Sequence, residues 1–171
     1  MCGYGQSDPV FFIPGSFSPD PRIITYVVPE GTAIFIGLGG AECSKVEPPP
    51  FFGTNEQELA ACATVVNDSI IDLGVSINGE DVADVMSYRT VSPMFTLTFP
   101  EDNLFGVAPG VANSVSDSYS IIIAPPPPGE YEIVVSMKFE GEEPFVGTMR
   151  IIVEAPQIIE PEANPAATPQ T

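Results

Sequence analysis

The chain has 171 residues, with 23 acidic and only 5 basic side chains, so its formal net charge is −18; it contains no histidine and no tryptophan. This charge disfavours binding to nucleic acids and to anionic membranes. The missing histidine excludes Ser-His-Asp triads, blue-copper sites and most zinc sites. No apolar run reaches the roughly 20 residues of a membrane-spanning helix. We therefore expect one compact domain with no nucleic-acid partner and no membrane insertion.

Short β-branched and aromatic runs dominate the first fifty residues. Residues 11–13, 23–28 and 32–37 are predicted as strands, and a Pro-Glu-Gly turn separates the last two. The stretch 39–53 contains three consecutive prolines and is predicted as an irregular loop.

The segment near residues 55–68 breaks this β pattern. Apolar residues recur at 59, 62, 63, 66 and 70, which is the stripe of an amphipathic helix. Thr54 with Gln57, or Asn55 with Glu58, offers a capping box, and the acidic first turn suits the helix dipole. The sequence therefore predicts one short α-helix here.

Strand-like runs then resume to the end of the domain. They cover residues 73–77, 82–88, 95–99, 116–123, 131–139 and 146–153, and Asn78-Gly79 is a strong hairpin signal. Tyr131 follows a Pro-Gly turn, so it is either a corner tyrosine whose hydroxyl bonds back to the turn or an ordinary interior one. Residues 156–171 hold four prolines and few apolar side chains, which is typical of a linker or tail that packs against nothing.

About nine strands and one helix predict a mainly β domain over residues 1–155. Regular turn signals between short strands favour an antiparallel β-sandwich of Greek-key type, immunoglobulin-like or cupredoxin-like.

The three cysteines, Cys2, Cys43 and Cys62, match no zinc-binding spacing. A Cys43–Cys62 disulfide would tie the proline-rich loop to the apolar face of the helix and add about 3 kcal/mol. Two buried free thiols, or a pairing of either with Cys2, are the alternatives. A disulfide favours a secreted protein whose leader is absent from this chain; a complete chain would instead be cytosolic.

Several local runs together resemble an uncharacterised domain family that recurs in secreted proteins of environmental bacteria. Those runs, in chain order, are residues 5–13, 28–35, 42–44, 49–53, 58–63, 88–96, 100–106 and 114–117. Phe11 stands where the family pattern tends to show tryptophan, and the family's late histidine-containing strand is absent. The resemblance implies a secreted sandwich-like module and supplies no activity, substrate or catalytic residue.

Arg89 is one of only three arginines in this acidic chain. We expect it to pair with a buried or half-buried carboxylate, and Glu42, Asp102 and Asp117 are the candidates. An anion-binding pocket built around Arg89 is the functional alternative.

Acidic loops offer oxygen ligands for a metal. Glu101, Asp102 and Asn103 are the calcium candidates, and the run Glu80-Asp81 with Asp84 is a further one, although no EF-hand pattern is present. The same acidity also suits a protein kept soluble in high salt. No other cofactor is expected.

Carboxylate pairs are the only catalytic chemistry that the composition leaves, and no nucleophile elbow, phosphate loop or metalloprotease motif appears. We therefore expect no enzyme. The sequence favours a non-catalytic extracellular structural or adhesive module, part of a surface assembly or filament, that self-associates or binds a cell-surface partner. The alternative is a domain that binds a small ligand, carbohydrate or calcium.

Overall fold

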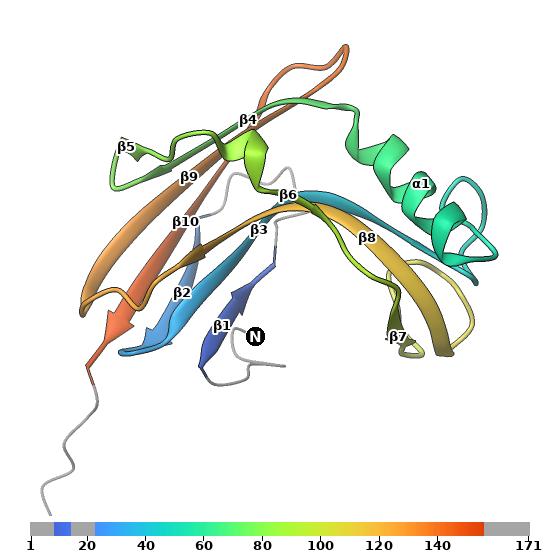
Figure 1. Ribbon diagram of the computed structural model, residues 1–171. Helices are drawn as coiled ribbons and strands as arrows, with labels where there is room; N and C mark the ends of the chain where they lie inside the picture. The colour runs from blue at the N-terminus through green and yellow to red at the C-terminus, as the bar shows by residue number, and fades with distance from the viewer. Residues whose placement is uncertain (1–8, 15–22, 156–171) are drawn as a thin grey trace, which may run out of the picture.

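The computed structural model describes residues 9–14 and 23–155, and it is mainly β with one α-helix (Figure 1). Residue Cys2 and the predicted tail 156–171 lie outside the described residues. In chain order the elements are β1 (Val10–Ile13), β2 (Ile24–Pro29), β3 (Ala33–Ser44), α1 (Glu56–Asn67), β4 (Ile70–Ile77), β5 (Glu80–Asp81), the short 3₁₀ helix η1 (Val85–Tyr88), β6 (Arg89–Val91), β7 (Phe95–Phe99), β8 (Gly110–Ile123), β9 (Gly129–Phe139) and β10 (Phe145–Glu154).

The strands form two five-stranded sheets. The first has the order β1-β3-β8-β6, with β7 also paired to β8, and the second has the order β2-β10-β9-β4-β5. Most neighbours are antiparallel, but β1 runs parallel to β3 and β2 runs parallel to β10. The expectation of a purely antiparallel sandwich was therefore wrong at these two strands. The chain enters one sheet with β1 and crosses to the other with β2.

The long strands β3 and β8 belong to two separate cores. At one end their inner face packs against the second sheet, in a core that includes the fully buried Ile13, Ile36, Ile133 and Ile151. At the other end the same face is covered by α1, as Figure 1 shows. The helix contributes Leu59 and Ala63, which pack with Cys43 and Val115 of the two strands.

A β-bulge in β3 separates these two halves. The pairing with β8 shifts between Gly37 and Gly39, and one extra residue reverses which side chains face inward. Before the bulge Ile34 and Ile36 face the core; after it Cys43 does, opposite Val115. Gly40 has no room for a side chain, since an added Cβ would lie 2.6 Å from the Asp117 carbonyl oxygen.

The helix agrees with its prediction. It spans Glu56–Asn67, within the predicted 55–68, and Asn55 is its N-cap because its side-chain oxygen accepts a hydrogen bond from Glu58 N at 3.0 Å. Glu58 in turn accepts hydrogen bonds from the amide and hydroxyl of Thr54, at 2.8 and 2.7 Å. No helix within residues 9–14 and 23–155 is long and apolar enough to cross a membrane.

Two segments differ from their predictions. Residues 39–44 continue β3 instead of forming a loop, because the glycine-rich bulge keeps the strand paired with β8. The hairpin turn at Asn78-Gly79 forms with positive φ at both residues, but its return strand ends at Asp81 and η1 follows. Tyr131 is a corner tyrosine, since its hydroxyl donates to the Pro127 carbonyl at 2.8 Å.

Candidate functional site

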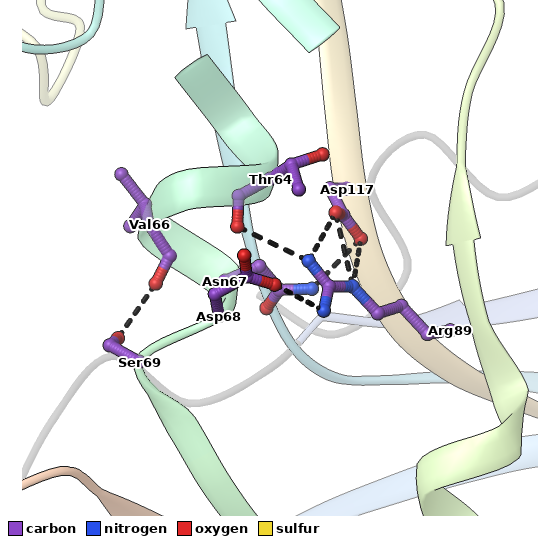
Figure 2. A network of polar contacts seen from close by, with 7 residues as sticks. All are labelled: Thr64, Val66, Asn67, Asp68, Ser69, Arg89 and Asp117. Atoms are coloured by element: carbon purple, nitrogen blue, oxygen red, sulfur yellow. Dashed lines mark hydrogen bonds and ion pairs between the residues drawn. The ribbon is translucent and has the colours of Figure 1, made fainter. Parts of the chain in front are cut away.

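Arg89 joins three parts of the fold, as Figure 2 shows. Its Nε and Nη2 donate to the Asp117 carboxylate at 2.6 to 3.1 Å, which is the bidentate geometry that guanidinium groups favour. Its Nη1 donates to Asp68 at 2.7 Å, and Nη2 also donates to the Thr64 carbonyl at 3.2 Å. The guanidinium also lies 5.8 Å from the centre of the Tyr119 ring, a cation–π distance.

Strand register brings Arg89 to this position. Arg89 of β6 pairs with Tyr119 of β8, so Asp117 is two residues along β8 on the same face. The helix meets this face with its C-terminal end, whose last turn has no basic residue of its own. The Thr64 carbonyl accepts a hydrogen bond from the Asp68 amide at 2.8 Å and a second one from Arg89. Arg89, which belongs to strand β6, supplies the positive charge that a helix C-terminus favours.

Asp117 is completely buried, so its charge requires partners. Asn67, itself 1% exposed, donates from Nδ2 to Asp117 Oδ1 at 2.9 Å. Burial alone would raise the pKa of Asp117, but the hydrogen bonds from Arg89, Asn67 and Thr64, with the Arg89 charge, outweigh it and lower that pKa. Asp117 is therefore an ionised carboxylate held by one arginine.

This arrangement holds the helix on the sheet and leaves little of Arg89 for a ligand. Four of the five guanidinium N–H groups have the acceptors named above, and hydrogen bonds to Asp117 and Asp68 raise the pKa of Arg89 further. Of the three predicted carboxylate candidates, the structure brings Asp117 to Arg89. Glu42 and Asp102 lie elsewhere.

Cys43 and Cys62 are joined by a disulfide, the pairing that the sequence favours. Their Cα atoms are 6.2 Å apart, and the bond links β3 to the helix beside Leu59 and Ala63. It therefore supports the same helix–sheet contact as Arg89.

A second acidic group, the half-buried Glu42, lies on the opposite face of β3 and β8, the outer face. Glu42 pairs with Ser116, next to the Ala41–Asp117 pair, so Glu42 and Asp117 point to opposite faces. Ser114 donates from its hydroxyl to Glu42 Oε1. The partner of Glu42 is Glu47, which is only 5% exposed.

Among the residues that the structure describes, no basic side chain pairs with Glu42 or Glu47. Burial raises the pKa of Glu42 to about 7; the Ser114 hydrogen bond lowers it, and the hydrogen bond and charge of Glu47 add to the rise. One oxygen of each carboxyl, Oε2, is buried without a hydrogen-bond partner among the described residues. The two acids thus form a carboxyl pair, unlike the arginine-neutralised Asp117.

The predicted calcium candidates lie in the turn between β7 and β8. Glu101 and Asp102 are exposed, whereas the Asn103 side chain is committed to the loop. Its Nδ2 donates to the Pro100 and Val107 carbonyls, both at 2.8 Å, and its Oδ1 accepts from the amides of Phe105 and Val107. Within residues 9–14 and 23–155, no three acidic or cysteine side chains are grouped as metal ligands.

Sequence reasoning missed Asn67 and Glu47. Asn67 is the last residue of the helix, and an asparagine at a helix end is usually interpreted as a capping residue. Glu47 lies in a proline-rich segment, where the expected state of an acid is exposed. Its only local signal is Ser44 three residues earlier, whose hydroxyl accepts from Glu47 N at 3.2 Å.

Comparison with known proteins adds little to this site. No family model matches the chain, and no curated protein matches it. Among solved structures, the solution structure of Amebosin is similar at 14% identity and a TM-score of 0.25, covering 84% of this chain and 96% of that one.

Proposed function

We propose that the chain is a non-catalytic extracellular module with a structural or adhesive role, part of a surface assembly or filament. The observation that carries this proposal is the commitment of Arg89. The residue best suited to bind an anionic ligand is turned inward onto Asp117, Asp68 and the end of α1. Arg89 thus stabilises the contact between the helix and the first sheet.

Two further features support the proposal. The Cys43–Cys62 disulfide suits an oxidising, extracellular compartment. Around the β7–β8 turn, large apolar side chains are exposed: Leu104 is 91%, Val111 68% and Phe105 50% exposed. Such side chains suit contact with another protein, and we take that protein to be a second copy of the chain. We also propose that the two sheets form a sandwich of the Greek-key type, immunoglobulin-like or cupredoxin-like.

Analytical ultracentrifugation over a concentration series tests the proposal. We expect the weight-average mass to rise with concentration, at a salt concentration that screens the net charge of −18. Leu104→Ser should lower this association, whereas Val65→Ser, on α1 at 71% exposure, should leave it unchanged.

A thermal-shift screen with calcium and a panel of sugars tests the alternative. The structural role predicts no shift with any of them. A monomer at every concentration whose melting temperature rises with one sugar or with calcium would contradict the proposal and favour the ligand-binding alternative.

A further inference from the structure

The loop of residues 45–53 folds back along the end of β3, where Phe52 pairs in parallel with Ser44. Ser44 N donates to the Phe51 carbonyl at 3.2 Å, Gly53 N donates to the Ser44 carbonyl at 3.4 Å, and Lys45 N donates to the Asn113 carbonyl at 3.1 Å. The Ser44 hydroxyl accepts from the Glu47 amide. Glu47 is only 5% exposed, and its side chain interacts with that of Glu42.

The contact between this loop and the strands therefore includes two acids facing each other. Glu42 and Ser114 belong to the strands, whereas Glu47 belongs to the loop. Two carboxylates only accept hydrogen bonds, so a bond between them requires a proton on one of the two. Without that proton, two like charges would face each other with little water between them.

Within residues 9–14 and 23–155, no ion pair with a basic group compensates these two acids. Lys45, the one basic residue of the loop, is exposed. On β8 the residues facing the pair are Ser114 and Ser116, because Asp117 points to the other face. The neighbouring β7 reads Phe-Thr-Leu-Thr-Phe and has no charged side chain. Among the described residues, Glu47 is the charged group that acts on Glu42.

We propose that Glu42 and Glu47 form a proton-dependent latch, which holds the 45–53 loop against β3 and β8 while the pair shares one proton and loosens when that proton is lost. The loop carries Phe51 and Phe52, which are 38% and 43% exposed. Opening the latch would therefore change the position of two aromatic side chains at this end of the domain.

The direction of the pH effect follows from linkage. An ordinary glutamic acid in the unfolded chain has a pKa of 4.5, whereas that of Glu42 in the fold is about 7. Between these values the folded state binds more protons than the unfolded state, so stability falls as pH rises. The loss is complete once the pH passes the folded-state value, and below about 4.5 the stabilisation is fully present.

Melting temperatures between pH 5 and pH 8 test the latch in three variants. In Glu42→Gln the amide replaces the protonated acid, and in Glu47→Gln the charge on the loop is removed. Glu101→Gln is the matched control, since it removes one exposed charge at the same end of the first sheet. We expect the melting temperature of the natural chain and of the control to fall by about 5 °C more than that of either latch variant.

Hydrogen exchange of residues 45–53 reports the loop directly. After correction for intrinsic rates, protection in the natural chain should drop about tenfold from pH 5 to pH 8, and in Glu42→Gln it should stay constant. Equal pH dependence in the natural chain and both latch variants would overturn the proposal.

Two measurements on the natural chain keep the test decisive should a variant fail to fold. Carbon-13 NMR of the glutamate carboxyls should show one group that titrates near pH 7, and its absence would overturn the latch. Adding calcium at pH 8 should leave the melting temperature unchanged. A rise that Glu47→Gln abolishes would show that the pair binds a cation instead of a proton.

Discussion

Asp117 and Glu42 occupy neighbouring positions in the ladder between β3 and β8, but they lie on opposite faces and are neutralised differently. On the inner face Arg89 and Asn67 surround Asp117 with donors. On the outer face Glu42 meets a second acid and one serine hydroxyl. The comparison shows that the surroundings of a carboxyl decide its charge: a fixed cation lowers the pKa of Asp117, whereas burial, with the added effect of a second acid, raises the pKa of Glu42.

The two faces should therefore respond to pH in opposite directions. The lowered pKa of Asp117 adds stability that is present above its unfolded value and is lost as the solution becomes more acidic. The raised pKa of Glu42 adds stability that is lost as the solution becomes more alkaline. Stability should then be greatest in the mildly acidic range between the two.

Removing the cation of the inner face should have the largest effect. Arg89→Met leaves Asp117 completely buried with Asn67 and Thr64 as its remaining partners, and it also removes one hydrogen bond to the Thr64 carbonyl near the end of α1. We expect a loss of about 3 kcal/mol in urea unfolding, since one partner of a buried ion pair is deleted. Arg150→Met, an exposed position on β10, is the control and should cost little.

A double variant separates charge from packing. Arg89→Met with Asp117→Leu removes the unpaired charge and should recover part of the loss. If the double variant is less stable than Arg89→Met, the uncompensated charge is not the cause.

Reducing the disulfide should have a similar or slightly smaller effect. The Cys43–Cys62 bond closes a loop of 19 residues' separation, for which chain entropy gives about 3 kcal/mol. Urea unfolding with and without a reductant measures it, and Cys43→Ala with Cys62→Ala should reproduce the reduced value. The pH dependence of stability that Glu42 causes should remain after reduction. Its partners Glu47 and Ser114 are not part of the disulfide.

The acid side of the stability curve tests Asp117. As the pH falls below about 4, the natural chain should lose stability because Asp117 must be protonated on unfolding. Arg89→Met should lose less over this range, since its Asp117 is no longer held as a carboxylate. Parallel acid curves for the two proteins would show that other acids cause the acid unfolding.

Most helices and strands could be predicted from the sequence. Which side chains lie on the inner and outer faces of β3 and β8 could be predicted only in part. The helix, its cap and most strands follow from local spacing, and the acidic composition correctly suggested that Arg89 pairs with a buried acid. The bulge at Gly37–Gly39 was not predictable, because an extra residue reverses the alternation that assigns side chains to faces. Continued alternation from Ile34 and Ile36 would place Glu42 inside and Cys43 outside.

The pair of Glu42 with Glu47 was beyond sequence reasoning for a different reason. Local rules place an acid of a proline-rich loop in water. Its burial depends on the bond from Glu47 N to the Ser44 hydroxyl, and on backbone bonds that Ser44, Lys45 and Gly53 donate to residues of the loop, of β8 and of β3. Contacts of this kind are set by the whole fold and leave no spacing signal.

The smallest expected effect comes from making the inner face resemble the outer one. Asn67→Asp replaces the amide that donates to Asp117 with a carboxyl of the same shape, so Asp117 would face an acid as Glu42 does. At pH 5 a shared proton can restore that hydrogen bond, and we expect almost no change in the free energy of unfolding. At pH 8 the new acid must either ionise beside Asp117 or keep a proton at a cost.

The loss at pH 8 should remain near 1 kcal/mol because Arg89 stays in place and attracts both carboxylates. Urea unfolding of Asn67→Asp at the two pH values measures it, with Gln57→Glu at an exposed position of α1 as a control that adds the same charge away from Arg89. In the Arg89→Met background the same change should cost more at pH 8, since the pair would then lack the Arg89 cation, and Glu42 and Glu47 likewise have no cation among the described residues. An equal cost in both backgrounds would mean that Arg89 does not neutralise the inner face, and the contrast between the two faces would fail.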